Sequence, residues 1–123
     1  MVERNFEARI LGARLRAAAA DLRLDAEELG LVVGCGLTLA GELLDGREKR
    51  LAVAVESEAR RLVEVVELVR RLLPGYDPAE WLRADNPGLG GFSPLETMVD
   101  GFGGMVRVRN RLRHELLDRD GIA

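Results

Sequence analysis

The feature that most constrains the fold is a long helical pattern over residues 48–73, which ends at Pro74-Gly75. Its apolar side chains recur at steps of three and four residues, the spacing that places them on one face of an α-helix. That face consists of Leu51, Val55, Ala59, Leu62, Val66, Val69 and Leu73. A second set, Val65, Leu68 and Leu72, widens the face, so the sequence predicts a helix that packs on two sides.

Charged side chains occupy the other face of this helix. Arg60 and Glu64 are four residues apart, and so are Glu67 and Arg71. Ion pairs at this spacing contribute only about 0.2–0.5 kcal/mol each. We therefore interpret these charges as a solvated face.

The rest of the chain shows the same helical spacing, and no segment alternates as a strand would. A first helix is predicted over residues 6–22. Its buried stripe would be Ile10, Leu11, Leu15, Ala18 and Leu22. The fold class predicted from these patterns is all-α, with about six or seven helices and no sheet.

A cap signal and a glycine turn define a pair of short helices. Asp25 can cap the first, over residues 26–33, and the Glu28 side chain can reach back to the backbone N–H of the cap. Gly34-Cys35-Gly36 predicts a tight turn before the second, over residues 37–44. Such a pair is typical of a helix-turn-helix unit. Its core would be Ala26, Leu29, Val32, Leu37, Ala40 and Leu44.

The second helix of this pair would be the recognition helix if the unit binds DNA. Thr38 and Glu42 are then the candidates for contacting base edges, and Arg47, Lys49 and Arg50 follow where phosphate contacts are expected. The helix pair itself contains no arginine or lysine. Two interpretations remain open, a DNA-reading unit and a plain three-helix scaffold that does not bind DNA.

Proline-marked starts predict further helices after the long one. Asp77-Pro78 and Ser93-Pro94 each place a cap before a proline, which suits the first helical position because its missing N–H would have no partner there. A turn-rich linker over residues 86–91 separates them. The helix from Pro94 should end near Asp100-Gly101, and a last helix is expected over residues 105–118.

Length, charge and cysteine usage limit the class of protein. A chain of 123 residues can bury a sizeable core, and its single cysteine excludes an internal disulfide. The formal net charge of -3 argues against a generally basic nucleic-acid binder. We find no secretory signal in the first ten residues, and no apolar stretch near the roughly 18 residues of a membrane span. We therefore expect a cytoplasmic protein without a membrane segment.

The sequence offers little for catalysis, metal binding or cofactor binding. His114 is the only histidine and Cys35 the only cysteine, which is too few for a zinc site without many carboxylates. Two glycine clusters lie at residues 88–91 and 101–104. A phosphate-binding loop follows a strand and carries a Walker lysine, and neither cluster does, so we do not interpret them as phosphate-binding loops. We expect no enzymatic activity, no metal and no cofactor.

A set of residues in the second half of the chain carries a family resemblance. Trp81-Leu82 is followed by Asn86-Pro87, by Leu89-Gly90-Gly91, by Ser93-Pro94-Leu95-Glu96 and by Gly101. In order and spacing this resembles the toxin-binding domain of the MbcA/ParS/Xre family of antitoxins, over about fifty residues. The family also carries an N-terminal Xre-like helix-turn-helix, which corresponds to the helix pair above.

The resemblance implies an antitoxin of a type II toxin–antitoxin system. Its partner would be a RES-domain toxin, a class that destroys NAD, and the antitoxin would bind the folded toxin and obstruct the active-site cleft. We divide the chain into a weak Xre-like unit over residues 1–50 and a central helix with a toxin-binding helical domain over residues 51–123. The candidate toxin contacts are Arg107, Arg109, Arg111 and Arg113.

Two further expectations follow. Operator DNA would be a second partner if the antitoxin represses its own operon. A homodimer is expected because a helix-turn-helix protein usually reads two half-sites as a symmetric pair, and because the long helix is wider than one apolar face needs. The alternative from a different class is a stand-alone transcription regulator whose C-terminal half only dimerises.

Overall fold

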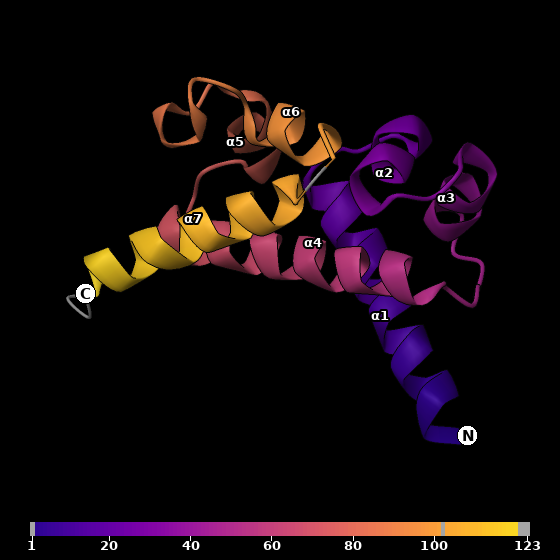
Figure 1. The fold of residues 1–123 in the computed structure, drawn as a ribbon. Helices are drawn as coiled ribbons and strands as arrows, with labels where there is room; N and C mark the ends of the chain where they lie inside the picture. The colour runs from indigo at the N-terminus through magenta and orange to yellow at the C-terminus, as the bar shows by residue number, and fades with distance from the viewer. Residues whose placement is uncertain (1, 102, 121–123) are drawn as a thin grey trace.

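The computed structural model describes residues 2–101 and 103–120, and these residues are helical without a strand (Figure 1). The elements are α1 (Val2–Asp21), α2 (Ala26–Val33), α3 (Leu37–Leu44), α4 (Val53–Leu72), α5 (Pro78–Arg83), the 3₁₀ turn η1 (Pro87–Leu89), α6 (Pro94–Val99) and α7 (Gly104–Arg119). The all-α prediction is confirmed. No described helix is apolar over a length that would cross a bilayer.

Helix α4 is the centre of the molecule and packs on two sides, as predicted. It contacts α1 on one side and α7 on the other, and α7 runs beside it for most of its length (Figure 1). The extra apolar width that suggested a dimer is therefore covered within one chain. That part of the argument for a homodimer was wrong, because the width serves α1 and α7.

The predicted start of the long helix at residue 48 was wrong, because α4 begins at Val53. Residues 47–52 are irregular. The charged run 47–50 has no apolar side chain to bury, and the Arg47 N–H instead closes the end of α3 by donating to the Glu42 carbonyl at 3.0 Å. Leu73 lies just beyond the last turn and is exposed rather than buried.

The predicted buried stripe of α1 was mostly right, with one error. Leu11, Leu15, Ala18 and Leu22 are buried, but Ile10 is 37% exposed. Ala19, which was not predicted to be buried, is fully buried. The buried face of α1 therefore includes Ala19 and leaves out Ile10. The helix also begins earlier than predicted, at Val2.

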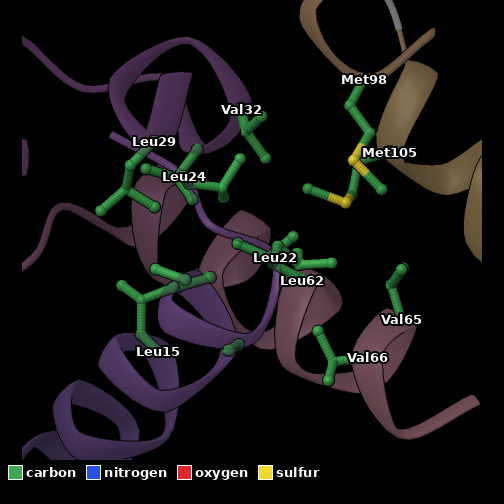
Figure 2. Close-up of a cluster of buried hydrophobic side chains, with 14 of the residues drawn as sticks. Leu15, Leu22, Leu24, Leu29, Val32, Leu62, Val65, Val66, Met98 and Met105 are labelled. Atoms are coloured by element: carbon green, nitrogen blue, oxygen red, sulfur yellow. The ribbon is translucent and has the colours of Figure 1, made fainter. Parts of the chain in front are cut away.

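One continuous apolar core joins the two halves of the chain. Figure 2 shows Leu15 of α1 and Leu29 of α2 in the same cluster as Leu62 of α4, Met98 of α6 and Met105 of α7. Helix α2 also contacts α6 directly. The C-terminal helices are therefore held in place by side chains from both α4 and the N-terminal helices.

Candidate functional site

The first element of the site, α5, begins where the sequence predicted. The Asp77 carboxylate accepts a hydrogen bond from the Ala79 N–H at 2.9 Å, and Pro78 occupies the first turn. Trp81 and Leu82 then point into the common core and are buried. These two residues anchor the segment and offer little surface to a partner.

The connection from α5 to α6 is a loop tied together by its own backbone, over residues 86–92. The Asn86 N–H donates to the Phe92 carbonyl at 3.0 Å, and the Asn86 carbonyl accepts from the N–H groups of Leu89 and Gly91. The Asn86 side chain accepts from the Gly88 N–H at 2.9 Å. Asn86 is thus the base of the loop, while Pro87 and Leu89 form its 3₁₀ turn.

The loop turns through two glycines in the left-handed region, Gly90 at φ 72° and Gly91 at φ 88°. Other residues are strained there, so the backbone explains both glycines. Leu89 is partly buried against the core, whereas Phe92 at the end of the loop is exposed. Figure 1 places this loop at the end of the molecule opposite α3.

Helix α6 begins with a full capping box. The Ser93 hydroxyl accepts from the Glu96 N–H at 3.0 Å, and the Glu96 carboxylate accepts from the Ser93 N–H at 3.1 Å. Ser93 and Pro94 are buried, Leu95 is partly buried and Glu96 is exposed. Both predicted proline-marked starts are therefore confirmed.

The glycines after α6 have different functions. Gly101 has φ 79°, as the predicted helix-ending glycine should. Gly104, which lies just before the predicted last helix over residues 105–118, begins α7 in close contact with α6. A Cβ at this position would overlap the Thr97 carbonyl, so only glycine lets the two helices approach this closely. Phe102, in the same cluster, lies outside the described residues.

The four candidate arginines of α7 do not form one surface. Arg109 and Arg113 lie beside Glu64 of α4, with Arg113 donating to its carboxylate at 2.5 Å. Arg107 and Arg111 lie on the opposite side and are exposed, with Arg111 paired to Glu115 at 2.9 Å. The structure thus separates two arginines beside Glu64 of α4 from two whose acidic neighbours, Asp100 and Glu115, come from the C-terminal segment itself.

The predicted pair of Arg60 with Glu64 was wrong. Arg60 pairs with Glu56 at 2.8 Å, because Glu64 is taken by Arg113 from the neighbouring helix. Among the described residues, no ion pair joins Glu67 to Arg71. Helical spacing within α4 could not show that another helix would supply a competing cation.

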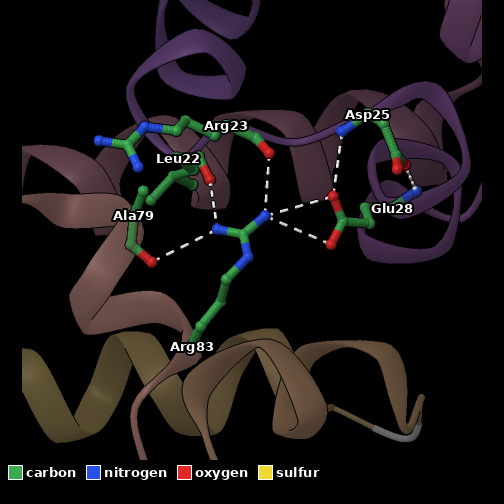
Figure 3. Close-up of polar contacts among 6 residues, drawn as sticks. All are labelled: Leu22, Arg23, Asp25, Glu28, Ala79 and Arg83. Atoms are coloured by element: carbon green, nitrogen blue, oxygen red, sulfur yellow. Dashed lines mark hydrogen bonds and ion pairs between the residues drawn. The ribbon is translucent and has the colours of Figure 1, made fainter.

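Sequence reasoning missed the residue that ties α5 to the N-terminal half. The Arg83 guanidinium donates to the Leu22 carbonyl at 2.7 Å and to the Arg23 carbonyl at 2.9 Å. It also contacts the Glu28 carboxylate at 3.3 Å, where Glu28 already completes the capping box of α2 (Figure 3). An arginine at the end of a short helix gives no sequence signal for such a contact.

The N-terminal pair, α2 and α3, has the predicted cap and turn. The Asp25 carboxylate accepts from the Glu28 N–H at 2.8 Å, and three residues join the two helices. Leu29, Val32 and Ala40 are buried, and Ala26 and Leu44 are partly buried. The prediction that Leu37 lies in the core was wrong, because this first residue of α3 is 64% exposed.

The DNA-contact candidates lie on and just after α3. Thr38 is exposed, and so are Arg47, Lys49 and Arg50. Glu42 is half-buried and accepts a hydrogen bond from Lys49 at 2.7 Å, which lowers the pKa of its carboxyl group. Lys49 is therefore engaged within the chain.

The lone cysteine and histidine show no arrangement for chemistry. Burial raises the pKa of the Cys35 thiol in the turn after α2, which disfavours the nucleophilic thiolate. His114 is exposed on α7, with its Nε2 3.5 Å from Asp118. Within residues 2–101 and 103–120, no cluster of three or more histidine, cysteine, aspartate or glutamate side chains could hold a metal ion.

Comparison with known protein families found one similarity, and it lies in the second half of the chain. Residues 68–115 match the family model for the antitoxin Xre/MbcA/ParS C-terminal toxin-binding domain. This segment is similar to the domain that it matches, and we call it the toxin-binding domain. No curated protein matches the chain.

The toxin-binding domain covers the end of α4, all of α5 and α6, and most of α7. It contains the residues from Trp81 to Gly101 on which the resemblance was based, and it contains all four candidate arginines. The match supports an antitoxin role in a toxin–antitoxin system, and this antitoxin family is generally non-enzymatic.

Proposed function

We propose that this protein is the antitoxin of a type II system whose toxin is a RES-domain protein that degrades NAD. The observation that carries the proposal is the match of residues 68–115 to an antitoxin toxin-binding domain. The antitoxin would act by binding the folded toxin and covering its active-site cleft. That mode requires a surface of fixed shape and no reaction of its own.

The fold supports such a mode. The toxin-binding domain shares its core with α4 and with the N-terminal helices, so its surface is held in one arrangement before binding. Preorganisation of this kind raises affinity because less conformational freedom is lost on association. We also propose that the protein acts in the cytoplasm, where an NAD-degrading toxin would meet its substrate.

The test is neutralisation of a RES-domain protein encoded beside this chain's gene. That protein is produced alone and together with this chain, and cellular NAD, growth and co-purification are measured. We expect NAD and growth to be restored and the two proteins to purify as a complex. If NAD falls equally in both cases and no complex forms, the proposal is refuted.

We also propose a second function, autorepression. In this proposal residues 1–50 form the DNA-binding unit and residues 51–123 form the toxin-binding part. Two eight-residue helices joined by a short turn favour autorepression. The charges oppose tight binding, because residues 25–46 carry five acidic side chains and no basic one. Thr38 would face the bases, and Arg47 and Arg50 would supply the phosphate contacts, whereas Glu42 and Lys49 are paired with each other.

We expect this DNA binding to be weak and to require a homodimer, because a single unit contacts only one half-site. Anisotropy of a labelled duplex from upstream of the gene would measure it. Affinity should fall steeply with salt and should fall further in the Arg47→Ala, Arg50→Ala double variant. Salt-resistant binding, or binding unchanged in this variant, would contradict the proposed contacts.

A further inference from the structure

The loop over residues 86–92 is a rigid projection from the toxin-binding domain. Four hydrogen bonds to Asn86, three at its backbone and one at its side chain, close the loop at its base. Leu89 packs against the core from inside the loop. The backbone that carries the side chain at the closing end of this loop is therefore held in place before any partner arrives.

Phe92 is that side chain, and it is 60% exposed. Its ring lies over Gly90, where an added Cβ would be 3.8 Å from the ring Cδ2. An isolated exposed apolar side chain is ordinary on a protein surface. Phe92 differs because it is an aromatic residue on a loop that is closed by its own hydrogen bonds and that Arg111 contacts at Gly88. Aromatic residues and arginine are enriched at protein–protein interfaces.

Two arginines lie on the side of α7 opposite to Glu64, and one of them contacts this loop. The Arg111 guanidinium lies against the loop backbone, so close that a Cβ on Gly88 would be 2.6 Å from its Nε. Arg107, one turn earlier, has a side chain that is 60% exposed. Each arginine has an acidic neighbour, Asp100 at 4.0 Å from Arg107 and Glu115 at 2.9 Å from Arg111, and each keeps an exposed side chain that a partner can contact.

We propose that Phe92 is the anchor of the toxin-binding surface and enters an apolar pocket of the folded toxin. Arg107 and Arg111 contact an acidic rim around that pocket. Arg109 and Arg113 stay on Glu64 and do not contact the toxin. This assignment rests on the proposed antitoxin function, and it names the surface by which that function is performed.

The test compares two exposed apolar side chains in the full chain. Phe92→Ala removes the proposed anchor, and Leu37→Ala removes a side chain of similar exposure on α3, outside residues 68–115. Each variant is titrated against the RES-domain protein encoded beside the gene. Thermal unfolding is measured in parallel, and both variants should unfold as the wild type does because both side chains face solvent.

We expect Phe92→Ala to weaken binding by about 30-fold or more, the loss typical of a buried aromatic anchor. Leu37→Ala should bind within about twofold of the wild type, because a substitution outside the interface leaves it intact. Arg107→Glu with Arg111→Glu should slow association, and the defect should shrink at high salt because rim charges act mainly on the association rate.

The outcomes separate this inference from the function on which it rests. If the wild type binds and Phe92→Ala binds equally well, the anchor assignment is wrong and the antitoxin function stands. If Phe92→Ala and Leu37→Ala weaken binding equally, the effect is not specific to the loop and the assignment is also wrong. If the wild type does not bind the RES-domain protein, both proposals fail together.

Discussion

The helix pairs α2–α3 and α5–α6 are built by similar local rules and present different surfaces. Capping boxes begin α2 and α6, with Asp25 and Ser93 as the caps. The first pair is joined by three residues, and residues 25–46 carry five acidic side chains and no basic one. The second is joined by a longer loop that exposes an aromatic ring and is contacted by Arg111 of α7. Start and stop signals thus determine the backbone, while the exposed side chains determine the class of partner.

The two pairs also differ in how much of the core depends on them. Trp81 of α5 is a large side chain that is only 8% exposed to solvent. Replacing it with alanine should leave a cavity and lower the free energy of unfolding by about 3–5 kcal/mol. Urea denaturation followed by circular dichroism would measure the loss. A loss below about 1 kcal/mol would mean that the site collapses around the smaller side chain.

Arg83 joins the two pairs, so its removal should sharpen the comparison. Arg83→Gln loses bonds to two backbone carbonyls and to Glu28, and we expect a loss of about 1–3 kcal/mol. Arg60→Gln is the matched control, because its exposed pair with Glu56 is worth only about 0.3–0.5 kcal/mol. Equal losses in the two variants, measured by urea denaturation, would show that the Arg83 junction adds nothing beyond a surface ion pair.

The two caps provide a direct comparison between the pairs. Ser93→Ala should cost up to about 2 kcal/mol, and Asp25→Ala about 0.5–1 kcal/mol. The difference is expected because Ser93 is buried, which leaves the Glu96 N–H without a partner, whereas water can replace the exposed Asp25 carboxylate. Differential scanning calorimetry of both variants would test the order, and a larger loss for Asp25→Ala would reverse it.

The smallest expected effect on stability comes from the contact of Glu42 in α3 with Lys49, and it depends on pH. Lys49 lowers the pKa of Glu42 in the folded protein, so this contact stabilises the fold above the ordinary carboxyl pKa of about 4.3. The stabilisation disappears as pH falls through the lowered pKa. Wild type should therefore melt slightly above Glu42→Gln at neutral pH and together with it in acid. A gap that persists or grows in acid would contradict this sign.

Local signals in the sequence predicted the helix starts well. Asp25, Asp77 and Ser93 cap the helices that they were expected to cap, because an N-cap depends on residues within one turn. The two-sided packing of α4 was also visible in its apolar spacing. These features need no knowledge of which elements become neighbours.

Features that depend on neighbouring elements could not be predicted. Glu64 has a potential partner at helical spacing in Arg60, yet it pairs with Arg113 from α7. The close approach of Gly104 to α6 and the bonds of Arg83 depend on how helices dock. The exposure of Phe92 likewise follows from the loop geometry, which a run of turn residues indicates only as a turn.

The most direct test of the central claim is hydrogen exchange of the full chain with and without the RES-domain protein that we propose as its toxin. Amides in the loop over residues 86–92 and in α7 should become protected on complex formation, because the toxin-binding domain carries the contact. Amides in α2 and α3 should exchange at unchanged rates. Protection confined to α2 and α3, with the loop and α7 unchanged, would contradict the account.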